Sequence, residues 1–322
     1  MITSEQVGWF SQTFNSLVAN IEQAVLGKTA VVRLAVTCLL SEGHLLLEDA
    51  PGTGKTSLAK ALSNTVQGSS ARIQFTPDLL PTDVIGVSIW NQQTSQFDFK
   101  PGPIFATIVL ADEINRASPK TQSALLEVME EGQVTVDGIP HPVGPPFMVL
   151  ATQNPIEQAG TYRLPEAQLD RFLMRTSLGY PDHNTTVRLL GQSGLRDRST
   201  MVKALVPAST VTEMAAMAST VHTDPAVLAY VSLLAEETRR ADGVLLGVSV
   251  RGALALVRAA KTWAAANGRT FVAPDDIKAL VGPVFGHRLI LTPDAEFNGL
   301  NPSQVLARVV ADVPAPVERA AT

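Results

Sequence analysis

A glycine-rich stretch in the first quarter of the chain carries the residues best suited to bind a phosphorylated ligand. It reads Asp49-Ala50-Pro51-Gly52-Thr53-Gly54-Lys55-Thr56 and lies between an apolar strand pattern, His44 to Leu47, and a helical pattern, Ser57 to Val66. Its two glycines let backbone N–H groups approach phosphate oxygens, and the following helix points the positive end of its dipole at the same anion. In such a loop Lys55 reaches the β- and γ-phosphates, and the Thr56 hydroxyl binds Mg²⁺.

The loop departs from the common phosphate-binding pattern at its first position, where Asp49 replaces a glycine. Aspartate tolerates left-handed backbone geometry better than most residues, so we expect the loop to form. The alternative is a glycine-rich turn with a surface lysine, which the flanking strand and helix patterns disfavour. We therefore assign the ligand contacts to Gly52, Thr53, Gly54, Lys55, Thr56 and Ser57.

Two neighbouring carboxylates follow a second apolar strand pattern, Thr107 to Ala111. In open α/β sheets ligands bind at the carboxyl ends of the strands, and two acids placed there need a cation. Asp112 would hold Mg²⁺ through its water shell, while Glu113 would polarise the water that attacks the γ-phosphate. A strand that merely ends in acidic loop residues is the alternative, and the phosphate loop one helix and one strand earlier argues against it.

Five short strand patterns must position these groups. They are apolar runs that end in polar residues and alternate with helical stretches, which is typical of parallel strands buried on both faces. The runs are His44 to Glu48, Arg72 to Thr76, Thr107 to Asp112, Phe147 to Thr152 and Met174 to Leu178. The chain up to Tyr180 is therefore predicted to have an α/β fold.

Helix signals surround these strands. One amphipathic helix is predicted from Ser4 to about Ser41, and another starts at Pro119 behind the capping residue Ser118 and ends at Gly132. Two stretches, residues 84–100 and 134–141, break the alternation and predict inserted hairpins, the second with a type I′ turn at its Asp-Gly centre.

Strand signals fade after Pro181, and the remainder of the chain predicts helices. They are expected to begin at Pro225, at Ser249 and at Pro274, and a short helix followed by a loose tail is expected from Pro302 on. The predicted domains are an α/β nucleotide-binding core over residues 1–182 and a smaller all-helical domain with a short C-terminal tail over residues 183–322.

Composition limits the classes of function. The 322 residues, 45% of them hydrophobic, are enough for a substantial core, and the net charge of -5 disfavours a protein that binds mainly to nucleic-acid phosphates. The single cysteine, Cys38, lies in an apolar run and indicates a buried thiol in a reducing compartment. Glu5 stands where a secretory signal would carry positive charge, and no apolar stretch reaches roughly 18 residues, so we expect a cytoplasmic protein without membrane insertion.

Four motifs together resemble the MoxR family of AAA+ ATPases, and the resemblance covers nearly the whole chain. They are Pro51 to Thr56, Leu110 to Ala117, Pro119 to Glu127 and Ala151 to Pro155. The resemblance implies a P-loop AAA+ core with a parallel sheet and inserted β-hairpins, followed by a smaller all-helical lid domain. It also implies ATP and Mg²⁺ as cofactors and a homo-oligomeric ring, expected to be a hexamer.

The resemblance gives roles to residues outside the phosphate loop. Asn154 matches the sensor-1 position, whose side-chain amide would orient the attacking water or contact the γ-phosphate. Arg171, in Leu169-Asp170-Arg171-Phe172, matches the segment that carries the arginine finger, with Arg175 as the competing candidate. A finger supplied by a neighbouring subunit accelerates hydrolysis by about 10³ to 10⁵, so an isolated subunit is expected to be nearly inactive.

Two further segments match more loosely. Gly247 to Gly252 resembles the sensor-2 segment, in which Arg251 would contact phosphate, although valine stands at 250 where proline is usual and glycine follows at 252. Whether Arg251 acts in its own subunit or across an interface stays open. Val25 to Lys28 matches the segment that packs near the adenine, chiefly through backbone groups.

The expected function follows from these motifs. It is Mg²⁺-dependent ATP hydrolysis by a ring-forming chaperone that remodels or activates a partner complex, with a von Willebrand factor A domain protein as the implied partner. A magnesium chelatase-like motor subunit is the nearest alternative, and a DNA-acting AAA+ motor is disfavoured because the hairpin tips carry almost no charge. A scaffold that binds ATP without hydrolysing it is the third alternative, and the intact Glu113 and Arg171 argue against it.

Overall fold

The chain forms two compact units. The computed structural model describes residues 2–49, 52–154, 161–162, 164–192, 194 and 197–316. The sheet unit comprises residues 16–172 and 176–213, and the helical unit comprises residues 1–15, 173–175 and 214–322. Three predicted features lie outside the described residues: Ala50 and Pro51 of the phosphate loop, Pro155 after Asn154, and the tail beyond Pro316.

A five-stranded sheet with the strand order β2-β5-β8-β1-β9 organises the fold. The strands are β1 (Leu45–Glu48), β2 (Ser70–Gln74), β5 (Ile108–Asp112), β8 (Met148–Gln153) and β9 (Met174–Thr176). Strand β2 pairs with β5, β5 with β8 and β8 with β1, all in parallel. The five predicted strands are confirmed, and each lies within two residues of the predicted bounds.

The register of the sheet brings the carboxyl ends of four strands to one edge. Gln74 lies opposite Asp112, and Glu48 lies opposite Gln153. The inner strands β1, β5 and β8 are buried along almost their whole length, whereas the edge strand β2 is largely exposed. The predicted burial on both faces is therefore confirmed for the inner strands. The outer strand β2 instead carries exposed polar side chains.

The N-terminal helix pattern divides into two helices, which corrects the prediction of one. Helix α1 spans Ser4–Glu22 and α2 spans Thr29–Leu40. Gly27 between them has φ +69°, and a Cβ at that position would lie 2.9 Å from Thr185 Oγ1. Backbone conformation and packing both demand glycine there, so the helical pattern cannot continue through it.

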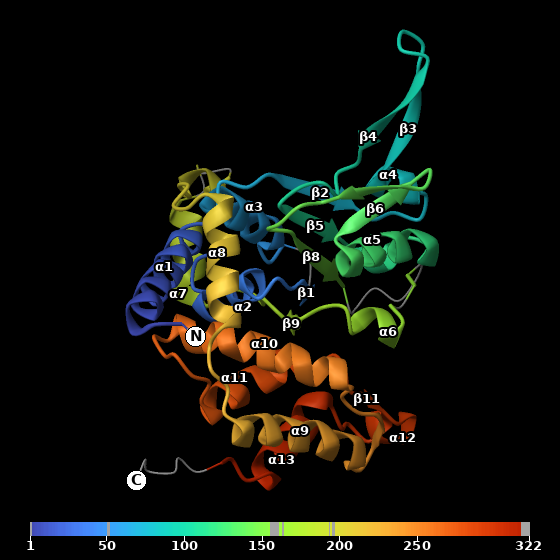
Figure 1. Ribbon diagram of the computed structural model, residues 1–322. Coiled ribbons are helices and arrows are strands. Elements are labelled where there is room, and N and C mark those ends of the chain that lie inside the picture. The colour runs from blue at the N-terminus through green and yellow to red at the C-terminus, as the bar shows by residue number, and fades with distance from the viewer. Residues whose placement is uncertain are drawn as a thin grey trace. The chain divides into compact units, whose positions relative to one another are not determined.

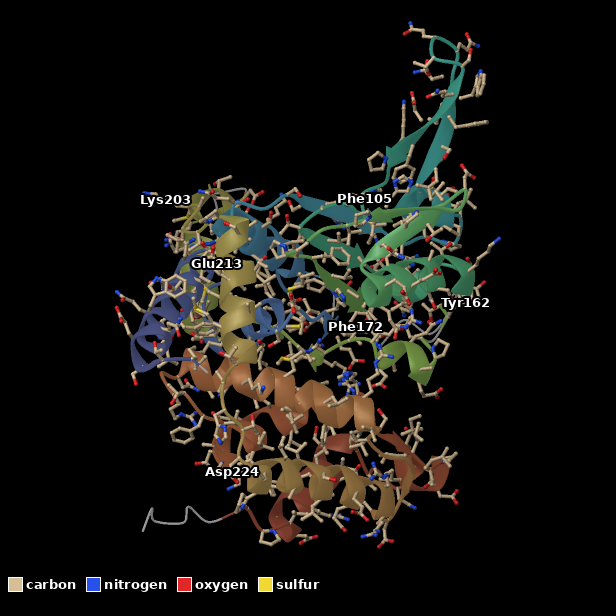
Figure 2. All side chains as sticks on the ribbon, in the orientation of Figure 1. Phe105, Tyr162, Phe172, Lys203, Glu213 and Asp224 are labelled. Atoms are coloured by element: carbon tan, nitrogen blue, oxygen red, sulfur yellow. The ribbon has the colours of Figure 1, made fainter. Side chains whose placement is uncertain are left out.

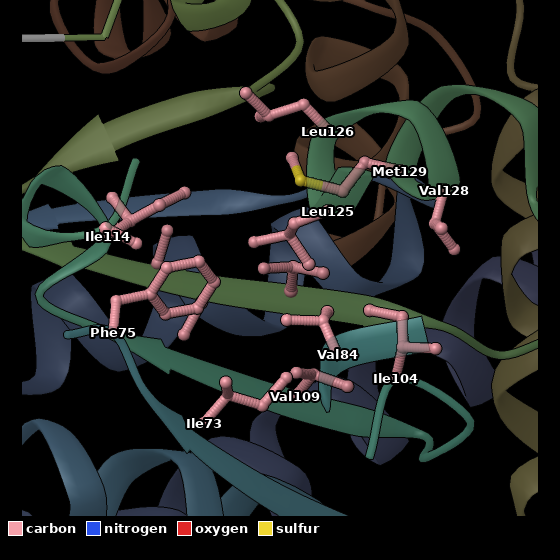
Figure 3. Close-up of a cluster of buried hydrophobic side chains, with 14 of the residues drawn as sticks. Ile73, Phe75, Val84, Ile104, Val109, Ile114, Leu125, Leu126, Val128 and Met129 are labelled. Carbon is pink, nitrogen blue, oxygen red and sulfur yellow. The ribbon is translucent and has the colours of Figure 1, made fainter. Parts of the chain in front are cut away.

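The remaining short and long helices of the sheet unit follow the strands. They are α3 (Lys55–Thr65), α4 (Pro81–Ile85), η1 (Ile114–Arg116), α5 (Pro119–Glu131), α6 (Glu166–Leu169), α7 (His183–Gly191) and η2 (Arg198–Met201), and α8 (Ala208–Ser219) runs into the helical unit. The α5 prediction is confirmed in detail: Ser118 caps the helix by accepting from Thr121 N, and Gly132 ends it with φ +64°. Leu125, Leu126 and Met129 of α5 join Val109 in the buried core against the sheet (Figure 3).

Two hairpins are inserted into the sheet unit, as predicted. The first is β3 (Gly86–Asn91) with β4 (Gln96–Pro101), and the second is β6 (Gln133–Val136) with β7 (Ile139–Pro142). The β3–β4 hairpin extends away from the sheet, and side chains stand out from both of its strands and its tip (Figures 1 and 2). At the tip of the second hairpin both Asp137 and Gly138 have positive φ, which fits the predicted type I′ turn.

The helical unit contains a small antiparallel pair that the sequence did not predict. Its strands are β10 (Val244–Leu246) and β11 (Ile290–Leu291). The helices are α9 (Pro225–Arg240), α10 (Val250–Ala266), α11 (Pro274–Phe285), α12 (Pro293–Phe297) and α13 (Pro302–Asp312), and the four predicted starts are confirmed. Among the described residues no helix combines the length and apolar character needed to cross a membrane.

Candidate functional site

The glycine-rich loop leads directly into the first turn of α3. Gly54 has φ +99° and is the N-cap residue, so Lys55, Thr56 and Ser57 form the first helical turn, where backbone N–H groups have no partner within the helix. All three side chains are partly exposed. The positive end of a helix dipole together with a lysine is suited to bind an anion such as a phosphate group.

The two glycines of the loop are also required by the backbone conformation, in addition to the predicted approach to phosphate. A Cβ added to Gly52 or to Gly54 would meet no atom of the described residues within 4 Å. Both residues, however, have left-handed backbones, with φ +82° and φ +99°. The loop therefore needs glycine at these positions for its backbone conformation, and the space around them is open on the side of the described residues.

Asp49 differs from the prediction. It does not have the positive φ that the sequence argument allowed for. Its buried carboxylate instead accepts three hydrogen bonds, from Ser177 Oγ and Gly179 N on Oδ1 and from Leu178 N on Oδ2, at 2.7, 2.8 and 2.7 Å. Asp49, which stands where glycine is expected, thus uses its side chain to hold residues 177–179.

The two predicted carboxylates lie at the end of β5, beside the loop-bearing end of the sheet. Asp112 Oδ1 accepts a hydrogen bond from Thr152 Oγ1 at 2.7 Å, and the same hydroxyl accepts from Glu113 N at 2.9 Å. Thr152 is fully buried on β8. One hydroxyl of the neighbouring strand thus positions both acidic residues.

A cation already contacts the candidate metal ligand. Arg72 of β2 donates from Nη2 and Nε to Asp112 Oδ2, at 2.7 and 3.2 Å. The arginine side chain is 54% exposed and that of Asp112 12%. The Asp112 oxygens and the Thr56 hydroxyl are hard ligands, and Mg²⁺ in phosphoryl-transfer sites takes only one or two ligands from the protein. The residues present therefore fit this ion.

Glu113 is held by two donors that approach the same oxygen. Gln74 Nε2 and Arg116 Nη1 lie 2.8 and 3.0 Å from Glu113 Oε2. The Glu113 backbone is left-handed, with φ +57°, a conformation that is uncommon outside glycine. Backbone strain of this kind is often found where a side chain must point in one functional direction.

Asn154 immediately follows β8 and is buried. The backbone of its neighbour Gln153 accepts a hydrogen bond from Asp49 N at 3.3 Å. Because this bond joins the end of β8 to the start of the glycine-rich loop, the predicted sensor-1 residue directly follows the strand end that contacts the loop.

The two candidate arginine fingers make different contacts within the chain. Arg171 Nε forms an ion pair with Glu130 Oε2 at 3.0 Å, and its side chain is 27% exposed. Arg175 Nη2 donates to the Gly286 carbonyl at 3.0 Å. Arg171 belongs to the sheet unit and Arg175 to the helical unit.

Arg251 lies in the first turn of α10 and is exposed. Ser249 caps the helix by accepting from Gly252 N at 3.2 Å. Gly252 is the residue that makes the sensor-2 resemblance looser. Packing favours glycine there, because a Cβ would lie 2.7 Å from Val248 Cγ1 and 2.8 Å from Arg288 Cδ. Arg251 is part of the helical unit, whereas the loop, Asp112, Glu113 and Asn154 are part of the sheet unit.

The hairpins expose aromatic side chains. Trp90 and Phe97 face each other across the β3–β4 hairpin with ring centroids 5.1 Å apart and are 50% and 67% exposed. At the base Phe99 stacks on His141 of the second hairpin at 3.9 Å, so the two hairpins contact each other. Residues 91–97 contain no charged side chain.

Sequence reasoning missed three residues of this site: Arg72, Gln74 and Thr152. The signal available was their place at or near the ends of predicted parallel strands, because such ends meet at the ligand-binding edge of a sheet. No cluster of three or more His, Cys, Asp or Glu side chains that could hold a metal ion occurs in the described part of the chain.

Comparisons with known proteins match both parts of the chain to AAA ATPase domains. Residues 44–174 match the family described as "ATPase family associated with various cellular activities (AAA)", and residues 236–309 match the AAA lid domain. YeaC of Bacillus subtilis is 45% identical over 94% of this chain and 95% of its own length. Chaperone MoxR1 of Mycobacterium tuberculosis is 37% identical over 94% of this chain and 82% of its own. A crystal structure of a protein from Cytophaga hutchinsonii described as an ATPase is 35% identical, with a TM-score of 0.90 over 97% of this chain and 98% of that one.

Proposed function

The chain belongs to the MoxR family of AAA+ ATPases, and we propose that it works as a ring-forming, Mg²⁺-dependent chaperone that remodels or activates a partner protein complex. The observation that carries the proposal is the arrangement at one sheet edge. Lys55 at the start of α3 and the acidic pair after β5 lie at the carboxyl ends of strands β1 and β5, which both pair in parallel with β8.

The proposed chemistry divides among these residues. The backbone of residues 52–57 and the Lys55 ammonium bind the phosphates. The Thr56 hydroxyl is a ligand of the ion, and Asp112 holds the ion through its water shell. Mg²⁺, when bound, would neutralise the negative charge that develops on the phosphate groups. Glu113 holds the attacking water and accepts its proton, and the Asn154 amide orients that water.

Completion of the site from a second subunit is part of the proposal. Arg171, or Arg175 in its place, would contact the γ-phosphate bound by the neighbouring copy, and Arg251 would contact phosphate from the lid. We propose a nucleotide-binding core over residues 1–182, a lid over residues 183–322 and a hexameric ring, in which Val25 to Lys28 lie near the adenine. Exposed Arg251 and the partly exposed Arg171 are accessible enough for such contacts.

The partner is proposed to be protein rather than nucleic acid. The relative from Mycobacterium tuberculosis is named a chaperone. The β3–β4 hairpin supports the same role, because it exposes Trp90 and Phe97 beside a tip without charged side chains. Nucleic-acid contacts depend on lysine and arginine at the phosphates. A von Willebrand factor A domain protein is the partner that the family resemblance implies. The compartment is a separate point: we propose a reducing one, which the buried thiol of Cys38 fits.

One experiment tests the core of the proposal. Purified protein is assayed for phosphate release from ATP with Mg²⁺ and with excess chelator, and Glu113→Gln protein in MgATP is used as bait for partners. We expect Mg²⁺-dependent turnover and a partner that is retained only in MgATP. Salt-sensitive binding to DNA without any protein partner would favour a DNA-acting motor instead. Co-purification with a porphyrin-binding subunit would favour a magnesium chelatase-like motor subunit.

A further inference from the structure

The carboxylate of Asp49 connects the start of the glycine-rich loop to a distant part of the chain. Both of its oxygens are used: Oδ1 accepts from Ser177 Oγ and Gly179 N, and Oδ2 accepts from Leu178 N, all within 2.8 Å. The residue is only 4% exposed. Hydrogen bonds to a charged acceptor are stronger than neutral ones, so this contact is firmly held.

Asp49 also contacts the candidate phosphate-binding lysine through its backbone. Lys55 Nζ donates to the Asp49 carbonyl at 3.2 Å. The Asp49 amide donates to the Gln153 carbonyl at 3.3 Å, next to Asn154. A shift of Lys55 toward a bound phosphate would therefore act on the same residue whose carboxylate holds residues 177–179.

The residues held by Asp49 continue a short segment that belongs to both units, residues 173–179, here called the crossover segment. Leu173 to Arg175 belong to the helical unit, and from Thr176 on the chain is part of the sheet unit. In the helical unit Arg288 Nη1 donates to the Leu173 carbonyl at 3.3 Å, and Arg175 Nη2 donates to the Gly286 carbonyl at 3.0 Å. A single residue, Thr176, separates Arg175 from Ser177.

We propose that Asp49 is a positioning residue that couples occupancy of the glycine-rich loop to the crossover segment and, through the backbone, to residues 284–288 of the helical unit. The inference rests on the proposed function, because it requires nucleotide at the loop. Glycine, the residue that the common pattern has at this position, could not make the coupling, since it lacks a side chain to accept from residues 177–179. The coupling is carried by hydrogen bonds at either end and by covalent chain between them.

A purely structural role for Asp49 makes a different prediction. A buried cap that only stabilises the fold would, when removed, lower stability and raise amide exchange equally with and without nucleotide. Coupling requires that a nucleotide-dependent change at the crossover segment disappear while nucleotide still binds. The difference between bound and free protein is therefore the quantity to measure.

The experiment is backbone amide hydrogen exchange on the full chain, with and without MgADP, for wild type, Asp49→Gly and Asp49→Asn. Asp49→Gly restores the glycine of the common pattern, so we expect the Kd for MgADP to stay within about fivefold of wild type. Exchange of the amides of Leu178 and Gly179 should rise at least about tenfold, as expected for loss of a hydrogen bond to a charged acceptor. The change in exchange that MgADP causes at residues 173–179 and 284–288 should be lost.

Asp49→Asn should give an intermediate loss. Its amide oxygen can still accept from Ser177 and Gly179, but its NH₂ group faces the Leu178 amide donor. Asp182→Asn is the matched control: Asp182 also accepts a backbone amide, Thr185 N at 2.7 Å, and asparagine caps a helix as well as aspartate does. If the Asp49 variants do not fold, Ser177→Ala is used in their place. It removes the hydrogen bond that the exposed Ser177 hydroxyl donates to Asp49, and it should reduce the change in amide exchange that MgADP causes.

Two results would overturn the inference while leaving the proposed function intact. One is wild-type protein that binds MgADP without any change of exchange in the crossover segment. The other is an Asp49→Gly protein with the same MgADP-dependent change as wild type. If wild-type protein binds no nucleotide, the proposed function and this inference fail together.

Discussion

Gln74 ends β2, Glu113 immediately follows the neighbouring strand β5, and the two side chains are joined by a hydrogen bond from Nε2 to Oε2 of 2.8 Å. Arg116 Nη1 reaches the same carboxylate oxygen at 3.0 Å. A general base must direct an oxygen toward the attacking water, and two donors here fix the position of Oε2. The side chain of the proposed base is thus restrained by one donor from β2 and one from η1.

Replacing Gln74 should release this restraint. In Gln74→Ala the neutral donor is lost, and a hydrogen bond of this kind contributes about 1 kcal/mol, so we expect basal turnover to rise by up to about fivefold. Nucleotide affinity should not change, because Gln74 contacts neither the loop nor Lys55 in the described structure. Steady-state ATP turnover together with the Kd for MgADP checks this. A fall in turnover at unchanged Kd would mean that Gln74 instead holds Glu113 in its productive orientation.

Replacing the base itself should separate binding from turnover. Glu113→Gln keeps the shape of the side chain and removes its basicity, so we expect at least about a hundredfold loss of turnover with retained ATP binding. Glu127→Gln, on the exposed face of α5, is the matched control and should behave as wild type. Wild-type protein that binds ATP and shows no turnover to lose would support the nucleotide-dependent scaffold.

How much of this site was predictable depends on where each residue's partners lie along the chain. Lys55 and Asp112 could be assigned because a strand, a loop and a helix in sequence order dictate their positions, and parallel strands bring their carboxyl ends together. Gln74 and Arg72 could not, because polar residues on an edge strand look the same whether they face solvent or a site. Their roles appear only once β2 is paired with β5.

Two predictions failed for the same physical reason. The Asp49 argument considered only the backbone, whereas its carboxylate is held by residues 128 to 130 positions away. The single helix predicted from Ser4 to about Ser41 rested on apolar spacing, whereas Gly27 is fixed in a left-handed conformation against Thr185, far along the chain. Local pattern carries no information about such distant partners.

Arg72 should compete with Mg²⁺ for Asp112. The pair is close, but the arginine side chain is 54% exposed, and an exposed ion pair contributes about 0 to 1 kcal/mol. In Arg72→Met we therefore expect the Mg²⁺ concentration for half-maximal turnover to fall by up to about fivefold, and the effect should shrink at high salt. Titrating Mg²⁺ at fixed ATP measures this. An increased Mg²⁺ requirement would show that Arg72 instead orients Asp112 toward the ion.

Lys55 should be essential for binding, in contrast to a lysine one and a half turns along the same helix. We expect Lys55→Ala to weaken nucleotide binding by at least about tenfold, because a charge-assisted contact to phosphate is lost. Lys60 of α3 forms an exposed ion pair with Asp197 at 2.7 Å and faces another segment. Lys60→Ala should therefore leave the Kd for MgADP unchanged, and equal effects of the two variants would argue against the assigned loop.

Arg171 provides the test of assembly. Within one chain its ion pair with Glu130 is partly exposed and contributes at most about 1 kcal/mol, so Arg171→Ala should fold normally. A finger acting across a subunit interface contributes about 10³ to 10⁵ in rate, so the variant should lose nearly all turnover while it still binds nucleotide. Specific activity of the wild type should rise with protein concentration.

Mixing two inactive variants then distinguishes action across an interface from action within one chain. Arg171→Ala subunits keep an intact Lys55, and Lys55→Ala subunits keep an intact Arg171. Where the two variants adjoin, the arginine of one should complete the nucleotide site of the other, so turnover should return in the mixture but in neither variant alone. Absence of recovery, combined with recovery when Arg175→Ala replaces Arg171→Ala in the mixture, would transfer the finger to Arg175. Turnover that is independent of concentration and never restored by mixing would contradict catalysis across an interface altogether.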